Sequence, residues 1–213
     1  LTQPMAHFVN NIMIGGHPRI KTVKNGPPVS YIQYPYRQMC KLVSGLIKDE
    51  MKLEGLKAGD IFILTGTLKY SWIKELENKL VSMGLLCFAP SSDEAKLDDK
   101  IIKDKVVFTT FHQSKGRERP LCIVFGFDTS YYDTFRDKTS SLKICPNLLY
   151  VATTRASRKL IIIENIEQKP ALPFLKMSHN QIYIQDYVKM HRHEELNGHP
   201  NINSKEEIGR AHV

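Results

Sequence analysis

Two short polar segments, each beside an apolar run, are the parts of this chain whose residue types are best suited to chemistry. The first is Thr-Thr-Phe-His-Gln-Ser-Lys-Gly-Arg-Glu-Arg at 109–119, and the second is Asn-Leu-Leu-Tyr-Val-Ala-Thr-Thr-Arg-Ala at 147–156. A buried strand gains nothing structurally by ending in hydroxyl, imidazole, ammonium and carboxylate groups together. Those groups suit a site that holds a nucleotide on one side and a charged polymer on the other.

The first segment offers groups that bind phosphate and ribose. Thr110 and His112 follow an apolar run, so we expect them at the carboxyl end of a strand, the edge where open α/β sheets bind ligands. Their side chains can face the same way on extended backbone and donate to phosphate oxygens. Lys115 and Gly116 add a charge and a turn, and Glu118 supplies a carboxylate suited to a ribose hydroxyl.

The second segment offers a guanidinium group. Arg155 ends a helix that we expect to begin at Asn147, and its side chain can stabilise the charge that develops on a transferring phosphoryl group. Thr153 and Thr154 precede it. Taken singly, such residues usually have plainer roles, the threonines as strand formers or caps and the cations as surface charges. The joint pattern is what favours a functional interpretation.

Other combinations that bind phosphate or metal are missing from the sequence. No Gly-x-x-x-x-Gly-Lys-Ser/Thr loop occurs, so the chain cannot by itself cradle the β- and γ-phosphates and Mg²⁺ of a nucleotide. Asp93 and Glu94 lie in a charged stretch and are expected to be solvated. His191, His193 and His199 lack further ligands at metal spacing and are expected in a polar tail, so no metal site is predicted.

Apolar, β-branched runs alternate with helical patterns, which predicts an α/β fold with a parallel sheet and helices on both of its faces. The strands are expected at 29–33, 60–65, 85–89, 106–110, 121–125 and 159–163. The helices are expected at 3–14, 36–54, 70–83 and 147–155. The stretch 90–105, dense in mixed charge, is expected to be an exposed loop.

Composition narrows the class of protein. The net charge of +8 favours an anionic partner such as nucleic acid, although solubility alone would also explain it. The four cysteines are scattered and fit buried thiols in a reducing compartment better than a disulfide framework. The sequence has neither an apolar run long enough to span a bilayer nor a signal-peptide pattern. We therefore expect an intracellular protein with no membrane partner.

Together the two segments resemble motifs V and VI of superfamily 1 helicases of the UvrD/Rep type. Residues 110–118 are similar to Thr-x-His-x-x-Lys-Gly-x-Glu, and residues 150–156 are similar to Tyr-Val-(Ala/Gly)-x-Thr-Arg-Ala. The resemblance covers residues 1–165 and implies the C-terminal RecA-like motor domain of an ATP-dependent DNA helicase. The residues of both motifs are most similar to those of helicases from large DNA viruses, and the family implies a role in DNA replication or repair.

The resemblance also implies a role for each matching residue. Thr110 and His112 would contact the phosphates of single-stranded DNA. The residues implied to bind ATP are Gly116, Glu118 and Arg155. Within that set, Glu118 would hold the ribose and Arg155 would be the arginine finger on the γ-phosphate. The residues implied to couple the two sites are Lys115, Thr153 and Thr154. Mg²⁺ would be held mainly by the N-terminal RecA-like domain of the same parent chain.

Arg117 and Arg119 depart from the family pattern, which favours apolar or aromatic residues there. They would either add contacts to nucleic acid or alter local packing. Larger relatives carry an accessory domain in the place that 90–105 occupies here, so the resemblance implies a compact variant. The family's motif IV would lie before Leu1, which implies that the chain is a fragment of a longer protein.

The remaining expectations concern the tail and the alternatives to a motor domain. Residues 166–207 are expected to form an extended or loosely packed tail. Residues 208–213 match one translated frame of a common sequencing adapter and are expected to be foreign to the protein. Two other functions stay open: an inactive, basic nucleic-acid-binding module derived from a helicase and, more weakly, a helicase-like domain fused to a nuclease. Without a phosphate loop, the fragment alone is expected to be inactive.

Overall fold

A parallel sheet forms the centre of the computed structural model, which describes residues 1–14, 18–93, 95–129, 131–132, 144–167, 172, 175 and 187–192. Its seven strands lie in the order β3-β4-β2-β5-β6-β1-β7, and each of these pairings is parallel. The strands are β1 (Val29–Tyr34), β2 (Ile61–Thr65), β3 (Cys87–Phe88), β4 (Val106–Thr110), β5 (Arg119–Phe125), β6 (Ala156–Asn165) and β7 (Val188–Arg192). The predicted α/β fold with a parallel sheet is confirmed.

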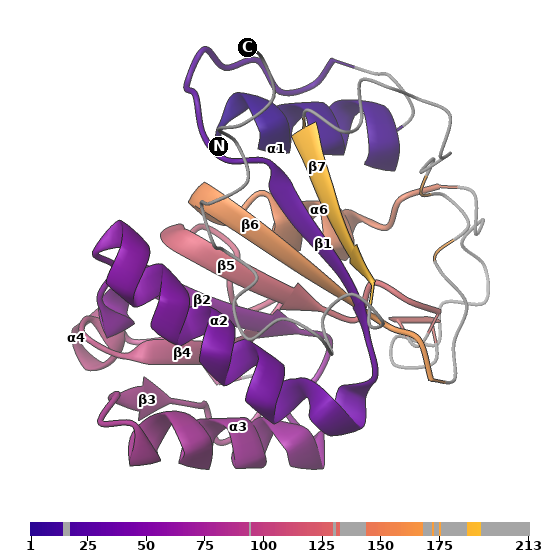
Figure 1. Ribbon diagram of the computed structural model, residues 1–213. Helices are drawn as coiled ribbons and strands as arrows, with labels where there is room; N and C mark the ends of the chain where they lie inside the picture. Colours follow the sequence, from indigo (N-terminus) through magenta and orange to yellow (C-terminus); the bar gives the residue numbers. More distant parts are fainter. Residues whose placement is uncertain are drawn as a thin grey trace, which may run out of the picture.

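Helices cover both faces of this sheet (Figure 1). On one face lie α2 (Met39–Glu54) and α3 (Ser71–Ser82), and on the other lie α6 (Asn147–Thr153) and the N-terminal helix. The N-terminal helix starts as α1 (Gln3–His7) and continues as a π-helix over Phe8–Met13. Among the described residues, no helix is both long and apolar enough to cross a membrane.

The central strands are buried on both faces, which explains their near-continuous apolar sequences. In β2, Phe62 and Leu64 pack in the core beneath α6 and the N-terminal helix, whereas Ile61 and Ile63 pack beneath α2 and α3. Successive side chains of a strand point to opposite faces of the sheet. A strand covered by helices on both sides must therefore be apolar throughout.

Apolar side chains at helical spacing explain why α2 and α3 form and where they lie. Each helix turns a stripe of such residues toward the sheet, with Trp72, Leu76 and Leu80 buried in α3. Gly55, at φ 66°, follows α2, and Gly84, at φ 83°, follows α3. Glycine adopts this left-handed conformation without the steric cost that a side chain imposes, so both helices end there.

A described part of the stretch 166–207 is a strand and differs from the loose tail expected there. Within it, Val188–Arg192 form β7, which pairs with β1 and extends the sheet. His191 lies on this strand and is buried, so the solvated position expected for it is wrong. A short, polar edge strand carries little hydrophobic periodicity, which is why the pattern did not predict it. His193, His199 and 208–213 lie outside the described residues.

The segment between β3 and β4 is more structured than the exposed loop predicted for 90–105. It contains the short helix α4 (Asp99–Ile102), capped by the Asp98 carboxylate, which accepts from the Lys100 amide at 2.8 Å. Leu97 and Ile102 are buried in the core. These two apolar side chains help to hold the charged stretch against the sheet. Two short 3-10 helices complete the described elements, Tyr36–Gln38 and Ala58–Asp60.

Asp93 also differs from its predicted solvated position. Its carboxylate accepts hydrogen bonds from the Thr67 hydroxyl at 2.7 Å and from the Leu68 amide at 2.8 Å. It therefore joins the loop that follows β2 to the loop that follows β3. Glu94, paired with it in the sequence prediction, lies outside the described residues.

Candidate functional site

A single short crossover connects the two edges of the sheet at which the predicted site residues lie. Because β4 and β5 both pair in parallel with β2, the chain must return from the carboxyl end of β4 to the amino end of β5. Residues 111–118 make this return without a helix, and Gly116 supplies a turn at φ 81°. Thr110 and His112 consequently lie at the carboxyl edge, and Glu118 lies at the amino edge.

At the carboxyl edge, the two predicted phosphate ligands differ in exposure. Thr110 is buried, and its hydroxyl donates to Gln113 Oε1 at 3.1 Å while accepting from the Gln113 amide at 3.2 Å. His112 is exposed. The imidazole is thus the group presented at the surface, whereas the Thr110 hydroxyl is committed to an internal contact.

Gln113 is a residue of this edge that the sequence interpretation did not single out. Its Oε1 also accepts from the Thr110 amide at 3.0 Å. Its Nε2 donates to the carbonyls of Ser92 at 3.0 Å and Ala95 at 2.8 Å. The side chain therefore ties the end of β4 to the loop that follows β3. The signal in the sequence is its place three residues after Thr110, from which a side-chain amide can fold back onto the end of the strand.

At the amino edge, hydrogen bonds join the two predicted motifs. Arg155 lies between α6 and β6, and its carbonyl accepts from the Arg119 amide at 3.0 Å. Its Nη1 donates in turn to the Arg117 carbonyl at 3.4 Å. Glu118, which is exposed, lies between these two partners in the chain, and exposed Gly116 precedes them. The residues predicted to bind a nucleotide are thus brought together at one edge.

The Arg155 side chain is half-buried and folds back along its own helix. Its Nε donates to the Val151 carbonyl at 2.9 Å, and its Nη2 donates to the Thr154 hydroxyl at 2.9 Å. A cation over the last carbonyls of a helix is favoured by the helix dipole. A guanidinium has five N–H groups, and the bonds to Val151, Thr154 and Arg117 use three of them. No contact within the described part of the chain uses the other two N–H groups, which leaves them for a ligand.

The residues predicted to couple the two sites divide into two kinds. Thr153 and Thr154 are buried, and their hydroxyls donate to helix carbonyls, Thr153 to Leu149 at 3.1 Å and Thr154 to Val151 at 2.9 Å. Such back-bonding shapes the end of a helix. Lys115 is exposed in the middle of the crossover. The threonines support Arg155 from within, while Lys115 presents a charge to solvent.

Arg119, which departs from the family pattern, is a buried structural residue. Its guanidinium donates to the carbonyls of Ile61 at 2.9 Å, Lys105 at 2.5 Å and Ile102 at 2.7 Å. It also lies over the Phe62 ring, 4.5 Å from the centroid. Burial lowers the pKa of Arg119 to about 10, which leaves it charged at neutral pH. Of the two roles expected for this residue, the packing role is the one observed.

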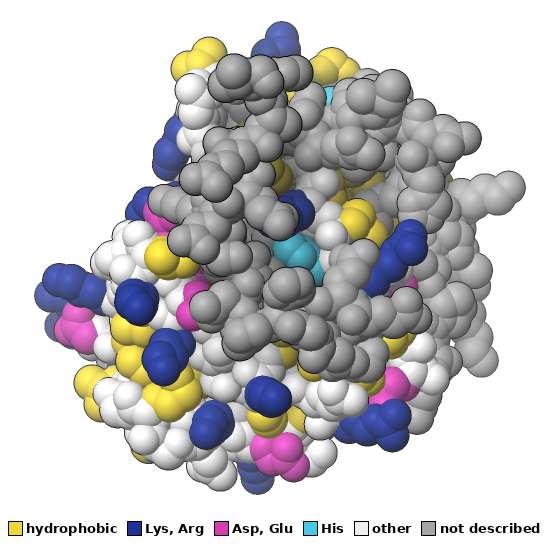
Figure 2. Space-filling view, viewed as in Figure 1, with side chains coloured by type: hydrophobic (Ala, Val, Ile, Leu, Met, Phe, Trp, Pro, Cys, Tyr) yellow, Lys and Arg dark blue, Asp and Glu magenta, His cyan; other side chains and the backbone are white. Residues whose placement is uncertain are grey.

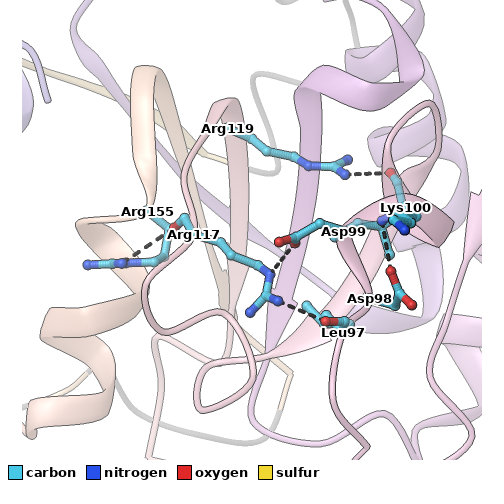
Figure 3. Close-up of polar contacts among 8 residues, drawn as sticks. Leu97, Asp98, Asp99, Lys100, Arg117, Arg119 and Arg155 are labelled. Atoms are coloured by element: carbon cyan, nitrogen blue, oxygen red, sulfur yellow. Dashed lines mark hydrogen bonds and ion pairs between the residues drawn. The ribbon is translucent and has the colours of Figure 1, made fainter.

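Arg117 also makes internal contacts, although it is only half-buried. Its Nε pairs with Asp99 Oδ1 at 2.8 Å, and its Nη2 donates to the Leu97 carbonyl at 2.8 Å. Figure 3 shows Arg117 lying between Arg155 on one side and the segment around Asp99 on the other. Its side chain and its carbonyl thus face different partners.

Buried carboxyl groups gather at the other edge, near the carboxyl ends of β1, β5 and β6. The Tyr31 hydroxyl donates to Glu164 Oε2 at 2.7 Å, and the Tyr36 hydroxyl donates to Asp128 Oδ2 at 3.3 Å. Burial raises the pKa of Glu164, and the hydrogen bonds from Tyr31 and Gln33 lower it in part. A raised carboxyl pKa marks an environment that disfavours the negatively charged form of the group.

On the described part of the face that carries α2 and α3, the positive charge is not gathered into one patch. Figure 2 shows Lys and Arg side chains spread singly over this face, between apolar and acidic groups. A nucleic-acid surface usually gathers its cations into a patch or stripe. The charge visible on this face therefore fits solubility, and the argument for an anionic partner depends on the sheet edges instead.

Comparison with known proteins adds an independent finding. The family model described as UvrD-like helicase C-terminal domain matches residues 41–167. The chain is also similar in fold to a solved structure, the C-terminal domain of a possible DNA helicase from Lactobacillus plantarum WCFS1. The TM-score is 0.55 at 14% identity, with 89% of this chain and 96% of that chain covered. Comparison with curated protein sequences finds no match.

The family match spans more than half of the chain and includes both predicted motifs, 110–118 and 150–156. On these findings, the chain belongs to the UvrD-like helicase C-terminal domain family.

Proposed function

We propose that this chain is the C-terminal motor domain of an ATP-dependent DNA helicase that binds single-stranded DNA at the carboxyl edge and ATP at the amino edge. The observation that carries the proposal is the crossover 111–118, which has His112 near its start and hydrogen bonds with Arg155 at its end. A shift of a bound strand at one end is transmitted along a short, helix-free segment to the other end. That is the coupling a translocating motor needs.

On the nucleotide side, the residues present fit half of an ATP site. Glu118 is an exposed carboxylate that can accept from ribose hydroxyls, and Arg155 has two uncommitted N–H groups for a phosphate oxygen. Bound ATP would supply the phosphoryl group whose cleavage drives the motor. The phosphate loop and the main Mg²⁺ ligands would come from an N-terminal RecA-like domain of the same parent chain, because no such loop occurs here.

Arg155 would have to leave part of its present setting to act as a finger on the γ-phosphate. Its bonds to Val151 and Thr154 are made to uncharged acceptors. Replacing them by bonds to phosphate pairs the cation with an anion, which adds charge–charge attraction that the present acceptors do not provide. Replacing the bonds to Val151 and Thr154 is therefore favourable only when an anion is bound. Until then the guanidinium stays hydrogen-bonded to its own helix.

On the nucleic-acid side, His112 is the direct phosphate ligand of the proposal, because its ring is exposed. Thr110 reaches a phosphate only after Gln113 releases its hydroxyl. In this arrangement Thr110 places the first turn of the crossover, and Lys115 adds positive charge along it. Single-stranded rather than double-stranded DNA is proposed from the motif resemblance, and the basic balance of the chain is compatible with either.

The test uses the full-length parent protein, with both motor domains, and compares Arg155→Ala with the control Arg158→Ala. Arg158 lies at the same edge but pairs with Glu54 on the protein surface. At saturating ATP and single-stranded DNA, we expect Arg155→Ala to lower kcat by about a thousandfold and Arg158→Ala to leave it nearly unchanged. Equal turnover in Arg155→Ala and the wild type would remove the finger from the proposal.

The same assay addresses the alternative of an inactive binding module. A wild-type parent that binds single-stranded DNA but hydrolyses no ATP under any DNA concentration would support that alternative. DNA-stimulated hydrolysis that depends on Arg155 would exclude it. A nuclease fusion predicts strand cleavage, which the same reactions reveal on a denaturing gel.

A further inference from the structure

Apart from Glu94, which lies outside the described residues, the segment 92–105 runs alongside the crossover 111–118 in the same direction, from the carboxyl edge to the amino edge. One connects β3 to β4, and the other connects β4 to β5. Three side chains from the crossover and the start of β5 bind the neighbouring segment in matching order along both stretches. The pairs are Gln113 with Ser92 and Ala95, Arg117 with Leu97 and Asp99, and Arg119 with Ile102 and Lys105.

Most of these contacts are made to main-chain carbonyls, so they fix the path of 92–105 rather than the identity of its side chains. Asp99 is the exception, because its carboxylate pairs with Arg117. Leu97 and Ile102 then bury their side chains in the same core as Phe111, the first residue of the crossover. The two stretches are thus bound to each other by polar contacts and share one apolar base.

Two of the binding residues also hold the functional groups proposed above. Gln113 holds both the amide and the hydroxyl of Thr110. The Arg117 carbonyl accepts from the Arg155 guanidinium. The first residue acts at the end of the crossover that faces nucleic acid, and the second acts at the end that faces the nucleotide. The neighbouring segment therefore touches both functional ends through one intermediate residue each.

We propose that 92–105 is a brace for the crossover, with Gln113 as the positioning residue on the nucleic-acid side and Arg117 as the positioning residue on the nucleotide side. The proposal rests on the proposed function of the two edges. Loss of the Gln113 contacts frees the turn that carries Thr110 and His112. Loss of the Arg117 contacts frees one of the three acceptors that hold the Arg155 guanidinium. Each end of the brace then controls a different kinetic quantity.

The experiment measures ATP turnover of the full-length parent protein against the concentrations of ATP and of oligothymidylate. For Gln113→Ala, we expect the half-saturating oligothymidylate concentration to rise about tenfold, with kcat at saturation within about twofold of wild type. For Arg117→Ala, we expect kcat to fall about tenfold, with the half-saturating concentration within about twofold. A purely structural role would move both quantities together or neither.

If Arg117→Ala does not fold, Asp99→Asn tests the same contact by a milder change. Asp99 is 79% exposed in its ion pair, so its replacement leaves the core intact. Surface ion pairs contribute little, and we expect kcat to fall about threefold without a change in oligothymidylate dependence. In the double variant with Arg117→Ala, the loss should be no larger than in Arg117→Ala alone, because Asp99 acts through Arg117. Additive losses would contradict this route.

Arg158→Ala and Arg155→Ala separate the possible failures. Suppose that the wild type is stimulated by DNA, that Arg155→Ala is inactive, and that Gln113→Ala and Arg117→Ala behave like Arg158→Ala. The brace is then overturned while the proposed function stands. The brace is also overturned if Gln113→Ala lowers kcat while Arg117→Ala raises the half-saturating oligothymidylate concentration. A wild type without DNA-stimulated hydrolysis overturns the proposed function and the brace together.

Discussion

The two edges of the sheet use polar residues in different ways. At the amino edge, three arginines lie close together, yet Arg119 is buried against carbonyls, Arg117 spans two segments, and Arg155 keeps two N–H groups uncommitted. At the carboxyl edge, a neutral amide, Gln113, holds a buried threonine beside the exposed His112. The difference shows that an arginine's burial and its number of unused N–H donors decide whether it is structural or can bind a ligand. Residue type alone does not decide this.

The largest effect that this comparison predicts is at Arg119. In Arg119→Met, the carbonyls of Ile61, Ile102 and Lys105 lose a charged donor, and the Ile102 carbonyl keeps its bond from the Lys105 amide. We expect the free energy of unfolding to fall by about 3 kcal/mol, because hydrogen bonds from a buried charged group are lost. Urea denaturation followed by circular dichroism measures the change.

The matched control is Arg37→Met, which removes an arginine whose side chain is 77% exposed in its ion pair with Glu167. Exposed pairs of this kind contribute about 0–1 kcal/mol. A similar loss of stability in Arg37→Met and Arg119→Met would show that burial does not separate structural from surface arginines here. The comparison between the edges would then lose its basis.

A second prediction tests whether the two edges act separately in the full-length parent. His112→Ala should weaken binding of a fluorescent single-stranded oligonucleotide about tenfold, since a contact to charged phosphate is lost, and leave KM for ATP nearly unchanged. Glu118→Ala should do the reverse, raising KM for ATP about tenfold through the lost ribose contact.

Fluorescence anisotropy and steady-state kinetics on the same protein preparations measure both quantities. Lys69→Ala serves as the control, because Lys69 is exposed near the carboxyl edge but lies outside both motifs. If His112→Ala and Glu118→Ala each changed both quantities equally, the two edges would not be separate sites, and the assignment of one ligand to each edge would be wrong.

The sequence predicted the structure well where the candidate site residues lie next to strands and helices with a clear apolar pattern. The strand ending at Thr110 was predicted with its observed end, and the helix predicted over 147–155 begins at Asn147 as expected but ends at Thr153. Family resemblance supplied the motifs, and the matched family model covers them. The grouping of Glu118 with Arg155 was also predictable, because both belong to segments that border parallel strands.

The rest depended on contacts between residues far apart in the chain. Arg119 is buried because Ile61, Ile102 and Lys105 happen to present carbonyls to it, and no local pattern encodes that coincidence. The charged stretch around Leu97 resembles a solvated loop until Arg117 and the core are seen to hold it. The edge strand β7 is too short and too polar to be recognised without its partner β1.

The smallest predicted effect is on stability and concerns the carboxyl edge, where the buried charged groups are carboxyl groups and not arginines. Burial raises the pKa of Glu164 above its ordinary value of 4.5. The folded protein therefore binds this proton more tightly than the unfolded chain does. The stabilisation from Glu164 is fully present below the ordinary pKa and is lost as pH rises through the folded pKa. Glu164→Gln removes this dependence.

The measurement is the difference in the free energy of unfolding between wild type and Glu164→Gln, followed by urea denaturation from neutral pH downward. As pH falls toward 4.5, the wild type should gain stability relative to the variant. Glu75→Gln, at an exposed position, controls for the general effect of removing one carboxylate. A relative loss for the wild type on acidification would mean that Glu164 is stabilised as a carboxylate. The carboxyl edge would then hold a buried negative charge as readily as the amino edge holds the Arg119 cation. The two edges would then differ in residue type, and burial would not explain the difference between them.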